Sequence, residues 1–442
     1  MGNTSGDQLW PEGVTPTPTF LALINHIQRS RENIFVTGRA GTGKSTLLRA
    51  VVKNLDGEAV IGAPTGIAAL NVGGETLHAL FRLPQSLLLD GDEEDASPRP
   101  VFDSDNVTLI IDEVSMVRSD AMNAIDLALR RKREVNQPFG GVRVIAFGDT
   151  HQLPPVANRV VEARLEDAFG GCSFFNAPGC RSMGLVELHD VFRQKDPAFV
   201  ALLNEVRDGR VSDTALAAIN RRVGPRPVQD AESWVWLCAT NQAAADINSR
   251  FLGDVNGQTK TYSAVLTGEF ENRSSNASGF PPEVQLTLKE GARVVFIRND
   301  RHRRWVNGTT GVVKSLGSDE IEVTTSAGED VTVSFETWTK RRRIKVGEEL
   351  REEELGSIAQ LPVRLGWAVT IHKSQGMTLD KVFMNTPKRL FASGQCYVAL
   401  SRARSLAGLR LLRPLTRDDI FLSADALGYR ALLPRLDLGG RP

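Results

Sequence analysis

A glycine-rich loop between a strand-like and a helix-like segment constrains this chain more than any other feature. The apolar run Ile34 to Val36 is typical of a buried strand, and the loop after it fits the pattern G-x-x-x-x-G-K-[ST]. Such glycines let backbone N–H groups close around a triphosphate, and the helix start that follows favours negative charge. The loop therefore predicts a nucleotide-binding α/β fold. The residues expected to hold the nucleotide are Gly38, Ala40, Gly41, Thr42, Gly43, Lys44, Ser45 and Thr46.

A nucleotide-binding loop of this kind acts together with carboxylates that bind Mg²⁺ and activate water, and the sequence offers two such carboxylates. The apolar run Leu109 to Ile111 ends in Asp112 and Glu113. Asp112 and the Ser45 hydroxyl are expected to hold Mg²⁺. Lys44 would reach the β- and γ-phosphates, and Glu113 would polarise the attacking water. A strand that ends in Asp-Glu can also be a solvated strand end, but its position downstream of the glycine-rich loop favours the catalytic interpretation.

Three further residues are candidates for contacts with the γ-phosphate. Gln152 follows the apolar run Val142 to Phe147, in a segment that could equally be a loop ended by prolines. Arg193 and Arg402 lie in a second α/β region, from which they could cross a cleft and stabilise charge on the transferring phosphoryl group. From spacing alone, each arginine could instead be a surface salt-bridge partner.

The alternation of apolar strand-like and helix-like segments predicts two α/β units with two insertions. The run Leu185 to Leu188 is expected to begin the second unit. Short β-like runs between Gly, Asn and Asp turns predict an antiparallel β-rich insertion in that unit. The predicted divisions are a loose tail 1–19, a first domain 20–183 with an insertion at about 72–106, a second domain 184–252 with 357–442, and the inserted domain 253–356.

Size and composition exclude several classes of protein. A chain of 442 residues is too long for one core, and 41% hydrophobic with 24% charged residues exclude wholesale disorder. Because 53 basic residues balance 53 acidic ones, any nucleic-acid contact must come from a local basic groove. No apolar run is long enough to span a membrane and the N-terminus has no signal-peptide core, so a soluble, cytoplasmic protein is expected. The four cysteines have no zinc-site spacing and are expected to be reduced thiols.

The short motifs of this chain, and their order along it, resemble those of the Pif family of superfamily-one helicases, in the 5′-to-3′ branch shared with RecD-like enzymes. The resemblance covers about residues 30 to 412. The stretch Leu127 to Arg131 followed by Pro138 to Gly141 resembles the one that marks the Pif family within the superfamily. The motifs are Gly38 to Ser45, Ala63 to Ala69, Thr76 to His78, Asp112-Glu113, Gly148 to Pro155, Phe192 to Gln194, Thr240-Asn241, Thr370 to Thr378 and Tyr397 to Arg402.

The resemblance implies two RecA-like P-loop NTPase domains, with ATP and Mg²⁺ between them and single-stranded DNA across both. It implies γ-phosphate contacts for Gln152, Arg193 and Arg402, and a nucleotide contact for Gly376. The 72–106 insertion matches the family's wedge element, and the β-rich insertion matches its SH3-like domain. The family's adenine-reading Gln upstream of the loop has no counterpart between Trp10 and Ile27. The residues that the resemblance places on the strand-binding face are Pro64, Thr65, Gly66, His78, Thr240, Asn241, His372, Lys373 and Ser374.

The strand-binding residues also make physical sense, because Thr, Asn, His and Lys side chains donate to phosphate oxygens without reading bases. Each has a structural alternative: Thr65 could cap a helix, and His372 could be a core histidine. Two basic stretches could track a strand or form a solvated face. They are Arg298, Arg301, Arg303 and Arg304 with Trp305, and Lys340 to Lys345.

The resemblance thus implies an ATP-dependent 5′-to-3′ DNA helicase that translocates on single-stranded DNA and unwinds duplex or structured DNA in replication, repair, recombination or telomere maintenance. The expected partners are single strands and single-strand/duplex junctions, with G-quadruplexes and RNA–DNA hybrids as further candidates. No membrane partner is expected, and the chain is expected to act as a monomer. Two alternatives stay open. One is a RecD-like helicase subunit, and the other is an ATP-gated single-strand clamp or translocase that does not unwind.

Overall fold

The computed structural model describes residues 10–11, 15–84, 87–89, 96–194, 196–226, 234–268, 270–271, 282–298, 300–302, 304–305, 309–346 and 349–438. For residues 67, 70, 71, 340–346 and 349–355, only the backbone is described. The chain divides into two compact units, one formed by 1–224 with 387–442 and the other by 225–386.

The first unit is built on a six-stranded sheet in the order β3-β2-β4-β5-β1-β6, with every pair parallel. Its central strands are buried along their whole length, as expected of a sheet covered on both faces. Such an all-parallel sheet with crossover helices is the architecture that the glycine-rich loop predicts. The strands are β1 (Ile34–Gly38), β2 (Glu58–Ala63), β3 (Glu75–Thr76), β4 (Val107–Ile111), β5 (Arg143–Gly148) and β6 (Gly184–Leu188).

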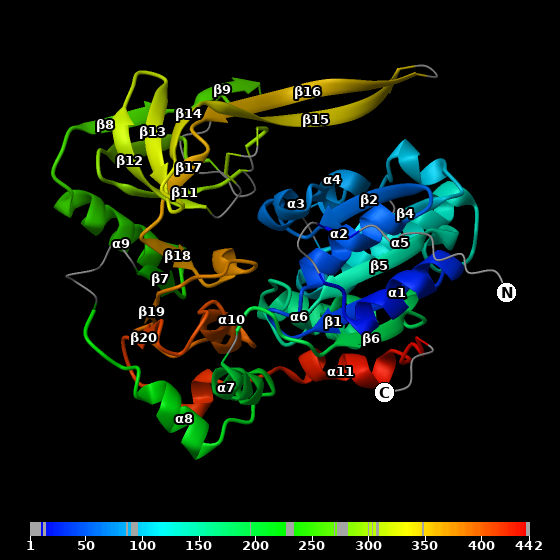
Figure 1. Cartoon of the computed structure of the whole chain (residues 1–442). Helices are drawn as coiled ribbons and strands as arrows, with labels where there is room; N and C mark the ends of the chain where they lie inside the picture. The colour runs from blue at the N-terminus through cyan, green and yellow to red at the C-terminus, as the bar shows by residue number, and fades with distance from the viewer. Residues whose placement is uncertain are drawn as a thin grey trace. The chain divides into compact units, whose positions relative to one another are not determined.

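Helices cover both faces of this sheet (Figure 1). Along β1, Ile34 and Val36 pack under α1 and α2, while Phe35 between them packs with α5 on the opposite face. This alternation follows from the two-residue period of a strand. The helices of the unit are α1 (Pro18–Arg29), α2 (Lys44–Asn54), α3 (Gly66–Val72), α4 (Leu77–Phe81), α5 (Ser119–Arg133), α6 (Arg159–Phe169), α7 (Pro197–Arg207), α8 (Asp213–Asn220), α10 (Gln395–Ser401) and α11 (Ala424–Leu432), and strand β20 (Leu409–Leu411) also belongs to it.

One part of the sequence-based division is wrong. The run Leu185 to Leu188 was expected to begin the second α/β unit, but β6 pairs with β1 in the first sheet. The reason is local. Two short 3₁₀ turns before β6 bury Phe174, Phe175 and Cys180, and they return the chain to the sheet edge beside β1. The predicted second domain, 184–252 with 357–442, is divided between the two units, and the other predicted boundaries stay a prediction.

The insertion predicted at 72–106 contributes its own short elements to the first unit. It contains β3, α4 and a 3₁₀ turn at Pro100–Asp103. Leu77, Phe81 and Phe102 are buried in the core of the sheet, with the rings of Phe81 and Phe102 stacked at 5.0 Å between centroids. Part of the acidic segment inside this insertion, residues 90–95, and most of the predicted tail lie outside the described residues.

The stretch expected to mark the family forms a clamp at the end of α5. Asp126 is buried on α5, receives the backbone N–H of Phe139, and pairs with Arg130 at 2.9 Å. The turn that it holds is strained for side chains: Phe139 has φ 55°, and Gly140 has φ 60° with a Cβ position only 2.4 Å from the Leu129 carbonyl oxygen. One buried carboxylate therefore holds a left-handed turn between α5 and β5.

The second unit combines a small parallel sheet with antiparallel β structure. Strand β7 (Val235–Cys238) lies between the parallel strands β18 (Ala368–Thr370) and β19 (Val382–Asn385), and α9 (Asn241–Asp254) follows β7. The β-rich insertion is confirmed. The other strands of the second unit are β8 (Thr259–Ser263), β9 (Val265–Gly268), β10 (Gln285–Lys289), β11 (Arg293–Phe296), β12 (Thr310–Leu316), β13 (Glu320–Thr325), β14 (Asp330–Ser334), β15 (Glu336–Val346), β16 (Glu349–Gln360) and β17 (Val363–Leu365).

These strands form a five-stranded antiparallel sheet in the order β14-β13-β12-β11-β17, a β10-β8 pair, and a β15-β16-β9 sheet. Strands β15 and β16 make the long hairpin at the end of the unit (Figure 1). The barrel-like core between the sheets includes Phe296 stacked on Trp305 at 4.6 Å.

Two further expectations concern the state of the cysteines and the presence of a membrane-spanning helix. All four cysteines have free thiols, and Cys180, Cys238 and Cys396 are buried. Within the part of the chain that the structure describes, no helix has the length and apolar character needed to cross a membrane.

The clamp at Asp126 gives a stability prediction. Asp126→Ala should lower the free energy of unfolding of the first unit by about 2–3 kcal/mol, because it leaves Arg130 and the Phe139 N–H without their acceptor. Asp103→Ala is the matched control, since it removes only an exposed pair with Lys132, worth below about 1 kcal/mol. Urea unfolding followed by far-UV circular dichroism measures both. Equal effects of the two substitutions would contradict the clamp.

Candidate functional site

The glycine-rich loop lies between β1 and α2, at the carboxyl end of the sheet. Gly41 has φ 84°, and a Cβ there would lie 2.6 Å from Cβ of Arg193, so only glycine fits. Gly43 has φ 79° and forms the N-cap of α2. The backbone thus brings the loop N–H groups and the first turn of α2 together, which is the arrangement that binds phosphate. Ser45 and Thr46 lie in that first turn, with Ser45 exposed.

Lys44 is directed back over the loop. Its Nζ donates to the carbonyl oxygens of Gly38 at 2.6 Å and Arg39 at 3.1 Å. Burial lowers the pKa of Lys44, while the charges of Asp149 and Glu113 oppose that shift. The ammonium therefore lies among carboxylates contributed by two other strand ends.

The two carboxylates after β4 lie at the same edge of the sheet. Asp112 is only 7% exposed, and its Oδ1 accepts the N–H of Glu113 at 3.0 Å. Glu113 has φ 49°, a left-handed conformation that turns its side chain away from the strand direction. Burial, followed by the charge of Glu113, raises the pKa of Asp112 to about 7, and burial also raises the pKa of Glu113.

These carboxylates suit a divalent cation. The Oε2 atom of Glu113 is buried and makes no hydrogen bond in the structure, and the pKa of Asp112 is raised by its surroundings. A cation would compensate both carboxylates. Mg²⁺ is usually bound through one or two carboxylates together with substrate phosphates, and Asp112 and Ser45 stay the residues predicted for this role.

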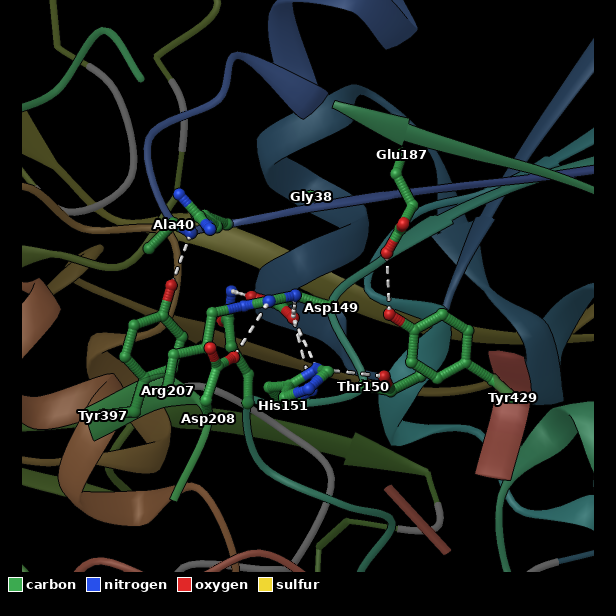
Figure 2. A network of polar contacts seen from close by, with 12 residues as sticks. Gly38, Ala40, Asp149, Thr150, His151, Glu187, Arg207, Asp208, Tyr397 and Tyr429 are labelled. Carbon is green, nitrogen blue, oxygen red and sulfur yellow. Dashed lines mark hydrogen bonds and ion pairs between the residues drawn. The ribbon is translucent and has the colours of Figure 1, made fainter. Parts of the chain in front are cut away.

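The turn after β5 adds a third group of polar residues. Asp149 is fully buried, and Gln152 is 4% exposed with Nε2 donating to Asp149 Oδ2 at 3.2 Å. Figure 2 shows Asp149 facing the buried guanidinium of Arg207, whose Nη2 lies 3.0 Å from Asp149 Oδ1. The sequence interpretation missed Arg207. Its only signal was a basic residue at the end of the apolar stripe of α7.

Both predicted arginines lie in the same unit as the loop. Arg193 packs against Gly41, and its Nη1 lies 3.4 Å from the carbonyl oxygen of Ser401. Arg402 is 1% exposed, with Nε donating to Val398 O at 2.9 Å. Burial, followed by repulsion from Arg193, lowers the pKa of Arg402 to about 9. Both arginines interact electrostatically with Glu113, so all three are neighbours.

A second missed residue links α10 to the loop. The hydroxyl of Tyr397 accepts the N–H of Ala40 at 2.7 Å (Figure 2). Tyr397 belongs to the motif that ends in Arg402, but no role had been assigned to it. The helix that contains this tyrosine and is followed directly by Arg402 is thus hydrogen-bonded to the phosphate loop.

Aromatic side chains lie beside Gly43, and one of them, Phe20, belongs to the segment in which the family's adenine-reading Gln has no counterpart. Phe20 on α1 and Phe192 lie beside Gly43, at 3.2 Å and 3.5 Å from the position of a Cβ there. Phe20 is buried, whereas Phe192 is 51% exposed. Trp10 stacks on Phe20 at 6.3 Å between centroids.

The predicted strand-binding residues of the first unit lie after β2 and on α4. Pro64, Thr65 and Gly66 connect β2 to α3, and Thr65 Oγ1 accepts the N–H of Ala68 at 3.2 Å. The helix-cap alternative for Thr65 is therefore met, and it does not exclude a contact with a strand. His78 is half-buried, and burial, followed by the charge of Arg118, lowers its pKa.

The predicted strand-binding residues of the second unit lie at the ends of its parallel strands. Thr240 caps α9 through Ala243 N–H at 3.3 Å, and Asn241 is exposed in the first turn. Lys373 is exposed, and His372 is half-buried with a pKa that burial lowers. Ser374 is fully buried.

Two of the predicted residues in this second group need separate comment. The Ser374 hydroxyl donates to Ile371 O at 2.7 Å, so it holds the turn in this structure. Gly376, the predicted nucleotide contact, has φ 79° and also lies in the second unit. The contact of Ser374 with a DNA strand and that of Gly376 with the nucleotide stay predictions.

Most of the described arginines in the basic stretch make contacts within the protein. Arg304 forms a bidentate pair with Asp300, at 2.7 Å and 3.0 Å, and stacks over Trp305. Arg298 donates to Thr337 O at 2.7 Å and lies over Trp338. Arg303 and the side chains of Lys340 to Lys345 lie outside the described residues. For Arg298 and Arg304, the structure favours a role in holding the β-rich insertion.

Comparison with known proteins agrees with this geometry. Residues 19–216 match the model of the PIF1-like helicase family. The chain is similar to the ATP-dependent DNA helicase Pif1 of Bdellovibrio bacteriovorus, at 33% identity over 87% of this chain and 85% of that protein. It is 36% identical to human ATP-dependent DNA helicase PIF1 over 86% of this chain, but it spans only 58% of the human protein.

Solved structures show the same relationship. A Bacteroides Pif1 helicase in complex with ADP-AlF3 and single-stranded DNA matches 95% of this chain with a TM-score of 0.74 and 34% identity. Pif1 helicase from Candida albicans matches 95% of this chain with a TM-score of 0.78 and 29% identity. These structures support the expected pair of RecA-like domains with a β-rich insertion.

The lysine gives the first prediction for this site. Lys44→Ala should abolish ATP hydrolysis and leave nucleotide-free binding of single-stranded DNA largely intact, because Nζ lies over the phosphate loop. Lys53→Ala, on the exposed last turn of the same helix, is the control and should hydrolyse ATP normally. Phosphate release and fluorescence anisotropy with a labelled oligonucleotide measure the two properties. Near-normal turnover of Lys44→Ala would contradict the assignment of the loop.

The arginines give the second prediction for this site. Arg193→Ala and Arg402→Ala should each lower kcat by roughly 10³-fold while weakening ATP binding only mildly, if they stabilise charge in the transition state. Arg210→Ala, an exposed arginine beyond the end of α7, is the matched control. Because Arg402 is buried, melting temperatures accompany the kinetics. A loss below about tenfold in a folded variant would make that arginine a structural residue.

Proposed function

This chain belongs to the PIF1-like helicase family, and from that premise we propose that it is an ATP-dependent DNA helicase that moves 5′ to 3′ along single-stranded DNA. One observation carries the proposal. The glycine-rich loop, Asp112-Glu113, the turn at Gln152 and the arginines Arg193 and Arg402 converge at one edge of a parallel sheet. A site that combines these groups is suited to hydrolysing a nucleoside triphosphate.

In this proposal, each group at the sheet edge has a defined part in hydrolysis. Lys44 and the loop N–H groups bind the β- and γ-phosphates. Glu113 accepts the proton of the attacking water, while Gln152 contacts the γ-phosphate. Arg193 and Arg402 stabilise the charge that develops as the bond to ADP breaks.

Asp112 and Ser45 are the proposed Mg²⁺ ligands. When bound, Mg²⁺ would neutralise charge on the phosphate oxygens. The raised pKa of Asp112 and the unpartnered Oε2 of Glu113 fit such an ion, since both carboxylates are buried without a full set of partners.

The nucleotide base is proposed to lie against the aromatic residues beside Gly43. Phe192 offers an exposed ring to a base, backed by Phe20. Neither ring can hydrogen-bond the edge of the base, so Phe20 and Phe192 do not themselves distinguish adenine from other bases. Gly376 remains the proposed contact from the second unit.

Single-stranded DNA is the proposed track. Its phosphates would be bound by Thr65 and His78 in the first unit and by Thr240, Asn241 and Lys373 in the second, with Pro64, Gly66, His372 and Ser374 shaping the same segments. Such donors bind any sequence, and affinity is expected to fall steeply as salt rises. Single-strand/duplex junctions are the proposed site of unwinding, with G-quadruplexes or RNA–DNA hybrids as further substrates.

The proposal also covers the cellular setting. We propose that the chain acts as a monomer in the cytoplasm, in replication, repair or recombination, as its membership of the PIF1-like helicase family suggests. The RecD-like subunit and the clamp that does not unwind are the competing functions.

Polarity of unwinding tests the proposal. Duplexes with a 5′ single-stranded tail should be unwound in the presence of ATP and Mg²⁺, whereas 3′-tailed and blunt duplexes should stay largely intact. The β-rich insertion lies between Asn241 and Thr370, an arrangement typical of the 5′-to-3′ branch. Strand separation is followed with a fluorophore–quencher pair on duplexes of identical sequence, with Lys44→Ala as the inactive control.

The other outcomes of this experiment are equally informative. Equal unwinding from 3′ tails would contradict the polarity. DNA-stimulated ATP hydrolysis without strand separation on any tailed duplex would favour the clamp or translocase.

A further inference from the structure

A buried ion pair lies beside the phosphate loop, and neither of its two residues has yet been given a role in hydrolysis. Arg207, the last residue of α7, is 4% exposed and donates through Nη2 to Oδ1 of Asp149 at 3.0 Å (Figure 2). Asp149 is fully buried directly after β5. A buried pair of this kind is costly to desolvate, and it is often no more stabilising than apolar residues of similar size. Its presence next to the nucleotide site therefore suggests a role beyond stability.

The carboxylate of Asp149 organises the turn that contains Gln152. Oδ1 accepts the N–H of His151 at 3.2 Å, and Oδ2 accepts Nε2–H of Gln152 at 3.2 Å. The backbone closes the same turn, with the N–H of Gln152 donating to the carbonyl oxygen of Asp149 at 2.9 Å. The side chain of Asp149 thus contacts both residues that follow Thr150.

The charge of Asp149 decides which way the amide of Gln152 faces. An ionised carboxylate only accepts hydrogen bonds, so it binds the NH₂ end of the amide and excludes the carbonyl end. One N–H of Gln152 is then held by Asp149, and the other can donate to a further acceptor. A protonated Asp149 could donate to the carbonyl oxygen, and the amide could then turn over.

Charged and titratable groups reach Asp149 from several elements. Burial alone would raise the pKa of Asp149, but the charge of Arg207, followed by that of Lys44, lowers it to about 2. The imidazole of His151 stays neutral, because burial and Arg207 lower its pKa to about 4. The groups that interact with Asp149 are Lys44, Glu113, His151, Arg207, Tyr397 and Arg402.

We propose that Arg207 is a positioning residue for ATP hydrolysis, which keeps Asp149 negatively charged and thereby fixes the amide of Gln152 with an N–H available to a γ-phosphate oxygen. This inference rests on the proposed role of Gln152 as a γ-phosphate contact. Arg207 itself touches no substrate in this scheme. It acts through Asp149, and a turned amide would present a carbonyl oxygen to the negatively charged phosphate instead.

The experiment compares the pH dependence of kcat for DNA-stimulated ATP hydrolysis between about pH 6 and 8. In Arg207→Gln, the buried carboxylate loses its partner, so its pKa rises and it becomes protonated as pH falls. We expect kcat of Arg207→Gln, divided by that of the unaltered protein at the same pH, to fall at least tenfold from pH 8 to pH 6. Arg207→Lys retains the charge and should restore a nearly constant ratio.

A purely structural role predicts a different result. If Arg207 only ties α7 to β5, Arg207→Gln should lower the melting temperature and its kcat ratio should be the same at every pH, which would overturn the proposal. Asp149→Asn gives an independent check, because its side chain does not ionise. Its kcat should be reduced by about tenfold or more at all pH values, with a constant ratio. A near-normal kcat of Asp149→Asn would also overturn the proposal, even if Arg207→Gln fails to fold.

Gln152→Ala separates this inference from the function on which it rests. A normal kcat in Gln152→Ala would remove the proposed γ-phosphate contact and the positioning role with it. If Gln152→Ala is impaired but the Arg207→Gln ratio does not change with pH, only the inference about Arg207 fails. Arg210→Ala should match the unaltered protein throughout.

Discussion

The parallel pairing of β5 with both β1 and β4 is the constraint from which the rest of the site follows. Thr37 is in register with Gly148, and Ile111 with Ala146, so these three strands end at one edge of the sheet. Whatever residues come next in the chain must meet there. The phosphate loop, Asp112 and Asp149 are separated by dozens of residues in sequence, and the sheet alone makes them neighbours.

The same convergence brings several charged side chains together in a site that is partly removed from water. Lys44, Glu113, Asp149, Arg207 and Arg402 are all largely buried, and each alone would be expensive to remove from water. The opposite charges of the others offset part of this cost in every case, and they outweigh it for Asp149 and Arg207, whose pKa values shift toward the charged form. For this reason, the effects of substitutions within this group are not expected to add.

The sequence predicted most of this arrangement because the relevant signals are local. A glycine-rich loop, an apolar run and the polar residues after it are adjacent in sequence, so Lys44, Asp112 and Gln152 were found. Arg207 and Tyr397 act through partners far away in sequence, Asp149 and Ala40, and no local pattern reports such a pair.

The errors and the unassigned features have the same origin. Strand β6 was placed in the wrong unit because a buried strand looks the same in either sheet, and only its pairing with β1 decides. The basic stretch near Arg304 was left open between a strand-binding surface and a solvated face, since its pairing with the carboxylate of Asp300 and its contact with the ring of Trp305 are visible only in three dimensions.

The hairpin of β15 and β16 has a mechanical consequence. Strand β9 pairs with β16 only from Gly356 to Ala359, and a bulge at Lys340 and Arg341 marks where the two-stranded ribbon begins. A ribbon of two strands bends more easily than a sheet. Its base is fixed by Gln360, which is fully buried and bonded to Tyr262 O, Glu283 O and Leu361 N. The ribbon is therefore anchored at Gln360, and from there the chain continues through β17 and β18 to His372. A force on the ribbon would act on this stretch of continuous backbone, which leads to the segment proposed to hold the strand.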